Sequence, residues 1–332
     1  MTLFDLRLSP EQLEIRDTVR DFVEREIRPA ALASARLEAF ERPLLTDLLE
    51  AASKLGLRVL ALSEEAGGAA ADALTRAIVT EELAAGDPDI AAVLAHTAAL
   101  APLLEGGPFL PKFLDDDRFH LALADGSAVQ GVLEGVATGV ANATVAKLFV
   151  VRTGSSALLV PRDTPGVSVR EQPGDWYHGS YGEVTFSSCR VPAANLAGPV
   201  GKIESPLPAI SLGIGRAAYE AALEYARIRV QGGRPIIEHQ AIAAKLEGIA
   251  VSLEVARAAV WRAAWASDHP EAVADRSLPD LSLQAVAEAF APEAMLRAAK
   301  DAAECFGAMG VMRDMPLHKY VRDARICLHS QR

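Results

Sequence analysis

The spacing of apolar residues changes twice along this chain of 332 residues. Before about Phe119 they recur at helical spacing, as in Val19, Val23 and Ile27 on one face of a predicted helix. After Phe119 the pattern becomes a series of short β-type runs separated by Gly, Pro, Asp and Asn. Helical spacing returns at about Pro206 and continues in long segments. This order predicts an α+β fold that is mainly α.

We predict three domains: an N-terminal helical domain (1–115), a small antiparallel β-domain (116–204) and a C-terminal four-helix bundle (205–332). The predicted β segments are His120–Ala124, Ala128–Ala137, Lys147–Thr153, Ala157–Pro161, Val167–Glu171 and Glu183–Val191. Hydrophobic residues make up 50% of the chain but aromatic residues only 5%, so most of the apolar content is Ala, Leu and Val. Alanine at helix contacts lets backbones approach closely, which favours a bundle.

Local signals predict where several helices begin and end. Ser9, Pro10 and Gln12 have the spacing of a capping box with proline at the first helical position. Pro29 is expected to end or kink that helix, because proline lacks a backbone N–H. Gly56 is well placed to end a second helix, which we expect over about residues 43–55.

Composition and charge exclude several classes of function. The net charge of -11 argues against a nucleic-acid or anionic-membrane partner. No uninterrupted apolar run is long enough for a membrane span, and no signal peptide is visible. The three cysteines (Cys189, Cys305 and Cys327) are widely spaced and predict a reducing compartment, so we expect a cytoplasmic protein. No cysteine or histidine cluster has metal-site spacing, so we predict no metal.

Several motifs resemble those of the acyl-CoA dehydrogenase family. They are SEEAGG (63–68), LLVPRDTPGVSV (158–169), GEVTFSSCRVPAANLAG (182–198), ECFGAMG (304–310) and RDAR (322–325). The resemblance covers nearly the whole chain and implies a flavoprotein oxidoreductase of fatty acid or lipid metabolism. It also implies FAD between the β-domain and the bundle, an acyl-CoA substrate, and electron-transfer flavoprotein or a similar acceptor. The family forms tetramers through the bundle, so we expect a homo- or hetero-oligomer.

The resemblance assigns two cofactor residues near the start of the bundle. Arg229 matches the arginine of the family's R-x-x-F-G turn, which reaches the FAD pyrophosphate of a neighbouring subunit; a guanidinium suits phosphate oxygens. Here Gly232 replaces the aromatic residue, and a solvated arginine at a helix end is the alternative. Gln240 matches the glutamine of E-H-Q, near the cofactor or a subunit contact, whereas Glu238 and His239 are as consistent with a polar helix start.

A second group of cofactor residues lies in the ECFGAMG motif, which matches Q-x-F-G-G-x-G on the adenosine side of FAD. Glu304, Gly307 and Gly310 are the candidates, and the two glycines would allow close backbone approach. Glu304 stands where glutamine is usual and Ala308 where glycine is usual. A carboxylate near a pyrophosphate is unfavourable, so a helix-ending turn without a ligand is the alternative. We interpret RDAR as structural.

Other family elements are missing, which puts the flavin-ring contacts and the catalytic base in doubt. The loop T-E-P-x-A-G-S-D is reduced to Ala124–Ser127, and Trp176 lies later than the family's W-I-T strand. The segment after RDAR contains no glutamate, so the usual catalytic base is not expected there. Some members have the base near the first bundle helix, and Glu204 is the candidate at that place; the alternative is a surface carboxylate at a helix start.

Two functions therefore remain open. The first is an FAD-dependent acyl-CoA dehydrogenase that desaturates an acyl thioester, with Glu204 or another carboxylate as base. The second is a non-catalytic or FAD-sharing subunit of a heteromeric acyl-CoA dehydrogenase complex, which would contribute Arg229 to the FAD of its partner.

Overall fold

The computed structural model describes residues 7–39, 42–129, 131–154, 156–172, 178–201, 203–273 and 281–329. The chain forms two compact units. The helical unit comprises Met1–Pro43, Asp72–Ala91 and Ser205–Arg332, and the β-containing unit comprises Leu44–Ala71 and Ala92–Glu204. The boundary after Glu204 coincides with the predicted start of the bundle, whereas the predicted N-terminal domain is divided between both units. The three-domain division stays a prediction.

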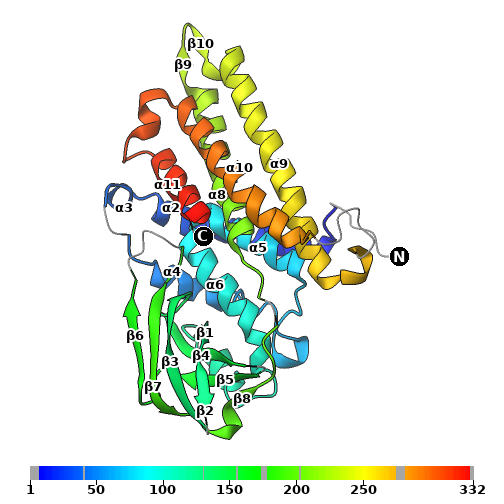
Figure 1. Cartoon of the computed structure of the whole chain (residues 1–332). Helices are drawn as coiled ribbons and strands as arrows, with labels where there is room; N and C mark the ends of the chain where they lie inside the picture. Colours follow the sequence, from blue (N-terminus) through cyan, green and yellow to red (C-terminus); the bar gives the residue numbers. More distant parts are fainter. Residues whose placement is uncertain are drawn as a thin grey trace. The chain divides into compact units, whose positions relative to one another are not determined.

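The helical unit is built mainly from long helices (Figure 1). Its helices are α1 (Pro10–Phe22), α2 (Arg28–Ala31), α3 (Ser34–Glu38), α5 (Ala73–Gly86), α8 (Leu207–Ile228), α9 (Gln240–Asp268), α10 (Leu283–Cys305) and α11 (Pro316–His329). A hairpin of β9 (Val230–Gln231) and β10 (Arg234–Pro235) joins α8 to α9 through a 3₁₀ turn, Ile236–Glu238. Helix α6 (Pro88–Leu100) begins in this unit and continues into the other.

The predicted capping box at Ser9 and the stop at Gly56 are confirmed, whereas helical structure does not end at Pro29. The Ser9 hydroxyl accepts a hydrogen bond from the Gln12 backbone N–H, and the Gln12 side chain accepts one from the Ser9 N–H, both at 3.1 Å. A π-helical segment, Val23–Ile27, separates α1 from α2, with Pro29 in the first turn of α2. The lost proline N–H is thus accommodated by a change of helix type. Gly56 follows the end of α4 (Thr46–Lys54) with a φ of 81°.

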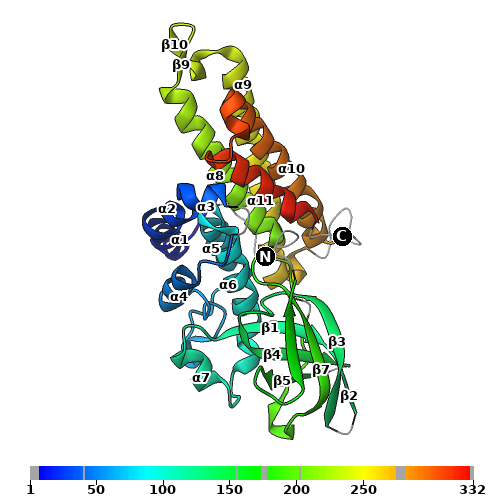
Figure 2. The ribbon, with the colours of Figure 1, turned by 90° about the vertical axis from the view of Figure 1, so that its left-hand side faces the viewer.

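Helices α8, α9, α10 and α11 form the predicted bundle (Figures 1 and 2). Helix α10 packs on both α8 and α9, α11 packs on α10 and α8, and α5 also packs on α8. Two glycines of α8 make these crossings close. A Cβ on Gly213 would lie 2.3 Å from the Glu81 carbonyl oxygen, and one on Gly215 would lie 2.3 Å from the Met295 sulfur. The small side chains therefore set the distances between helices, as expected for an alanine-rich bundle.

The β-containing unit has two four-stranded sheets, with the orders β1-β4-β5-β8 and β2-β3-β7-β6. The strands are β1 (His120–Asp125), β2 (Ser127–Val129), β3 (Val132–Val140), β4 (Ala146–Thr153), β5 (Ser156–Pro161), β6 (Val167–Glu171), β7 (Gly182–Arg190) and β8 (Leu196–Ala197). Its helices include α4 (Thr46–Lys54) and α7 (Leu110–Asp115). The predicted antiparallel pairing is confirmed for the other pairs of these sheets, but β1 pairs with β4 in parallel. Strands β2 and β3, which lie between β1 and β4 in the sequence, belong to the other sheet. The chain therefore returns to the first sheet at β4 running in the same direction as β1.

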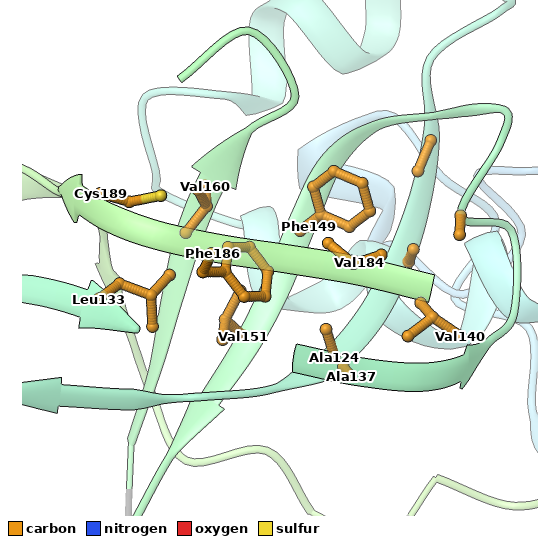
Figure 3. Packing of buried hydrophobic residues seen from close by; sticks show 13 residues of the cluster. Ala124, Leu133, Ala137, Val140, Phe149, Val151, Val160, Val184, Phe186 and Cys189 are labelled. Carbon is orange, nitrogen blue, oxygen red and sulfur yellow. The ribbon is translucent and has the colours of Figure 1, made fainter. Parts of the chain in front are cut away.

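Both faces of strand β4 are buried. Phe149 and Val151 lie in the core between the two sheets, where the ring of Phe149 meets Phe186 edge-on at 6.2 Å (Figure 3). Leu148 and Val150 point to the opposite face and pack in a second core with Phe113 of α7. This alternation has the period of two that a strand requires. It explains why the segment 148–151 is apolar without interruption.

Candidate functional site

The cofactor candidates of the bundle lie together at one end of the helical unit, where α8 ends, α9 begins and α10 ends. We call this region the bundle tip and define it as residues 225–245 and 301–311. Stacking of Tyr225 on Phe306, with ring centroids 4.0 Å apart, joins α8 to the end of α10. The Tyr225 hydroxyl also lies 3.7 Å from the Met309 sulfur. The structure thus brings together segments that are about 60 residues or more apart in sequence.

Arg229 lies where α8 turns into the hairpin. Its backbone N–H donates to the Tyr225 carbonyl at 2.9 Å, and its own carbonyl accepts from the Ile236 N–H at 2.8 Å. Hydrogen bonds to Tyr225 and Ile236 therefore hold the backbone of Arg229 in place. Its side chain is exposed, and none of the described residues pairs with the guanidinium. Arg229 therefore has guanidinium donors available, and its phosphate-binding role stays a prediction.

The hairpin turn explains why an aromatic residue is absent after Arg229. Gly232 and Gly233 have φ values of 60° and 83°. Two successive residues with positive φ form the tight turn that suits the twist of a hairpin, and glycine adopts this conformation without strain. The departure from R-x-x-F-G is thus a requirement of this turn.

His239 supports the hairpin from the start of α9. Its Nε2 lies 3.0 Å from the Gln231 carbonyl, and its Nδ1 lies 3.4 Å from Nη2 of Arg234. A neutral ring with the proton on Nε2 satisfies both contacts, because Nε2 then donates and Nδ1 accepts. His239 therefore has a structural role. Gln240 is the first residue of α9 and is exposed, and its cofactor role stays a prediction.

Glu304 forms an ion pair with Lys245 at 2.6 Å, and Lys245 also pairs with Asp301 at 3.3 Å. The hydrogen bond that the Lys245 ammonium donates to the Glu304 carboxylate is the main cause that raises the pKa of Lys245. This partner offsets part of the repulsion between a carboxylate and a phosphate. Lys245 was not predicted as a site residue. No local pattern reveals it, because its partners lie on another helix.

Gly307 and Gly310 have reasons within the chain to be glycine. Gly307 follows the end of α10 with a φ of 60°, the left-handed conformation common at helix ends. A Cβ on Gly310 would lie 2.0 Å from the Ala303 carbonyl oxygen. The turn therefore needs both glycines without any ligand. An added Cβ on Gly307 would meet no atom, so its backbone is open to solvent, and the binding roles of both glycines stay predictions.

Glu204 lies in an irregular segment before α8 and is half-buried. The preceding residue, Ile203, packs against the second core of the β-containing unit. Glu204 precedes the start of α8 and Arg229 follows its end; a helix of 22 residues is about 33 Å long. Glu204 belongs to the β-containing unit and the bundle tip to the helical unit, and the role of Glu204 as a base stays a prediction.

Some weaker sequence signals have structural explanations. Asn142, which begins the sequence Asn-Ala-Thr with the pattern of a glycosylation site, is buried, and its amide donates to the carbonyls of Val93 and Leu121 and the hydroxyl of Thr97 at 2.9–3.2 Å. Asp323 of the RDAR motif is buried against Lys319 at 2.6 Å, which supports its structural interpretation. Trp176 lies outside the described residues.

Two negative findings apply to the described residues only. They contain no group of His, Cys, Asp and Glu that could bind a metal ion. Among the same residues, no helix is long and apolar enough to cross a membrane.

Comparisons with known proteins identify the family. Residues 9–108 match the model of the acyl-CoA dehydrogenase N-terminal domain, and residues 207–328 match that of the C-terminal domain. The probable acyl-CoA dehydrogenase YngJ of Bacillus subtilis is 30% identical over 97% of this chain and 94% of its own length. A second acyl-CoA dehydrogenase of Bacillus subtilis is 29% identical, with the same coverage. Both alignments, of 377 and 369 positions, are longer than this chain, so the relatives contain residues that it lacks.

Solved structures agree with this assignment. Butyryl-CoA dehydrogenase from Megasphaera elsdenii has a TM-score of 0.81 at 23% identity, covering 98% of this chain and 95% of its own. A glutaryl-coenzyme A dehydrogenase in complex with glutaryl-CoA has a TM-score of 0.79 at 25% identity, covering 97% and 91%. The first likeness concerns the fold alone. Together with the domain models and the curated relatives, these findings show that the chain belongs to the acyl-CoA dehydrogenase family.

Proposed function

We propose that this protein desaturates an acyl-CoA thioester between its α- and β-carbons with FAD as cofactor. The observation that carries the proposal is the bundle tip, which presents the Arg229 guanidinium, unpaired among the described residues, and contains the Lys245–Glu304 ion pair. Unpaired cationic donors on an ordered backbone fit a pyrophosphate. Arg229, Gln240 and Gly307 of the bundle tip are exposed, so they fit the outer half of a cofactor site whose remainder belongs to another surface.

Bound FAD would supply the hydride acceptor. Arg229 would bind the pyrophosphate, and Gln240, Glu304 and the backbone at Gly307 and Gly310 would contact the cofactor beside it. Glu204 would remove the proton from the α-carbon of the thioester. The electrons would pass to electron-transfer flavoprotein or a similar acceptor.

A second function is an FAD-sharing subunit of a heteromeric complex. Residues 121–148 include no Phe, Tyr or Trp, so this part of the β-domain offers no aromatic side chain to a flavin ring. The relatives also contain residues that this chain lacks. These observations favour a chain that lends Arg229 to the FAD of a different subunit.

The visible spectrum of the purified protein distinguishes the two functions. A flavin band in the protein alone, bleached by butyryl-CoA or glutaryl-CoA, supports the dehydrogenase. Protein that acquires flavin only when co-expressed with the product of a neighbouring gene supports the shared subunit. Protein without flavin in both preparations contradicts both.

Two variants test the assigned residues. Arg229→Gln should lower flavin content, whereas Arg227→Gln, two residues earlier and also exposed, should leave it unchanged. Glu204→Gln should abolish bleaching by acyl-CoA while the flavin remains bound. Unchanged bleaching in this variant would remove Glu204 from the mechanism.

A further inference from the structure

The β-containing unit has a surface cavity that neither of these functions uses. Its volume is 590 Å³, within the range of small-molecule sites. Helix α7 and the strands β4 and β5 border it, and Figure 2 shows them in this unit. We call it the α7 pocket; it is lined by Phe109, Lys112, Phe119, Lys147, Leu148, Pro161, Arg162 and Asp163.

Half of the lining is apolar. Phe119 and Leu148 are buried, with exposed fractions of 7% and 0%, and they belong to the core that packs α7 against the sheet. Phe109 and Pro161 are half-buried beside them. Leu148 and Pro161 lie directly opposite each other in the pairing of β4 with β5. The base of the α7 pocket is therefore apolar and rests on a packed core.

The other half carries an excess of positive charge. Lys147 and Arg162 are neighbours, because the Arg162 N–H donates to the Lys147 carbonyl at 3.0 Å. Like charges at neighbouring strand positions are unfavourable unless an anion compensates them. Asp116 pairs with Lys147 at 2.5 Å. With Lys112 counted among the cations and Asp163 among the anions, one positive charge remains without a counterpart.

Arg162 is held in place and retains donors. Its Nη1 donates to the carbonyls of Ala143 at 2.6 Å and Ala146 at 3.2 Å. Within the described part of the chain, its Nε and Nη2 have no hydrogen-bond partner, and neither does the ammonium group of Lys112. A guanidinium fixed by two backbone bonds loses little entropy when it binds an anion.

We propose that the α7 pocket binds a small organic monoanion, namely a carboxylate with an aromatic or short aliphatic body. The body would lie on Phe109, Phe119 and Pro161, and the carboxylate would meet Arg162 and Lys112. The size of the cavity suits a ligand of this class, and the single excess charge suits one carboxylate. The site needs no flavin, so its test is independent of the proposed function.

Isothermal titration with three probes tests the ligand class. Naphthalene-2-carboxylate is expected to bind with one site per chain. Naphthalene-2-methanol lacks the charge and phosphate lacks the apolar body, so both should bind at least tenfold more weakly. Equal binding of the alcohol, or no saturable binding of the carboxylate, would overturn the proposal.

Two variants and a matched control test the location. Lys112→Gln should lower the affinity for naphthalene-2-carboxylate about two- to fivefold, as expected for the loss of one exposed charge. Lys54→Gln, the same change at an exposed helical lysine of the same unit, should have no effect. Phe109→Ala should weaken binding at least fivefold, with folding checked by circular dichroism. Identical affinities of Lys112→Gln and the unchanged protein, or of Lys112→Gln and Lys54→Gln, would place the ligand elsewhere.

Discussion

Replacing Gly213 with alanine is expected to destabilise the helical unit by about 2 kcal/mol. The added Cβ would lie 2.3 Å from the Glu81 carbonyl oxygen, 2.7 Å from the Ala84 Cβ and 2.8 Å from the Ala85 nitrogen. Two of these atoms belong to the backbone of α5, which is buried along most of its length. Because a backbone cannot rotate away as a side chain can, the cost should approach the upper limit of about 3 kcal/mol for overpacking. The better helix propensity of alanine returns about 1 kcal/mol.

The matched control is Gly248→Ala in α9. Gly248 also lies inside a helix of the helical unit, but an added Cβ there meets no atom within 4 Å. Only the propensity term remains, so this variant should be about 1 kcal/mol more stable than the unchanged protein. The same chemical change is therefore expected to have opposite signs at two helical positions.

Thermal unfolding followed by circular dichroism measures both effects. In a unit of this size, 1 kcal/mol shifts the midpoint by about 2–4 °C. We expect a fall of about 4–8 °C for Gly213→Ala and a rise of about 2–4 °C for Gly248→Ala. A midpoint for Gly213→Ala at or above that of the unchanged protein would refute the close crossing of α8 and α5. If the unfolding midpoints of both variants shifted in the same direction, the predicted difference between Gly213 and Gly248 would be refuted.

Three further predictions concern buried polar groups. Arg216→Met should cost about 3 kcal/mol in urea unfolding, because Arg216 is 7% exposed and shares the buried Glu82 with Arg20, each at 2.7 Å, so that one partner of Glu82 remains; Arg170→Met, in an exposed ion pair, should cost under about 1 kcal/mol, and equal costs would contradict this. Asn142→Ala should cost about 2–3 kcal/mol, since it leaves buried carbonyls unpaired; a fully stable variant would show that these bonds are dispensable. Burial lowers the pKa of His120 to about 4, so the unfolded chain binds a proton first as the pH falls. Titration of His120 therefore leaves the free energy of unfolding unchanged above about pH 6.5 and should lower it by about 3 kcal/mol between pH 6.5 and pH 4. His120→Gln should remove this part of the pH dependence of unfolding, and an unchanged pH profile would contradict the prediction.

Much of the fold could be predicted because its signals are local. The capping box at Ser9 and the stop at Gly56 depend on residues within one turn of the helix end. The strands follow from β-type residues between turn formers. The parallel pairing of β1 with β4 was missed, because partner choice depends on residues distant in the chain.

The candidate site was predictable only where a motif names a residue. Arg229 and Gln240 came from the family resemblance, and their neighbours in space did not. Lys245 was not predicted as a site residue, because its carboxylate partners lie on α10, more than fifty residues later in the sequence. The α7 pocket was not predicted for the same reason, because its cations come from a helix, a strand and a turn that meet only in the folded chain.

The sequence by itself determined the family, the order of helical and β segments, and the residues with the chemistry to bind a phosphate. Only the tertiary structure decided which charges are compensated and which glycines are needed for packing. Gly310 is needed because of the Ala303 carbonyl beside it, and Glu304 is compensated because Lys245 lies 2.6 Å away. The physical reason is range: periodicity and capping act within a few residues, whereas ion pairs and close packing join atoms that are neighbours only in space.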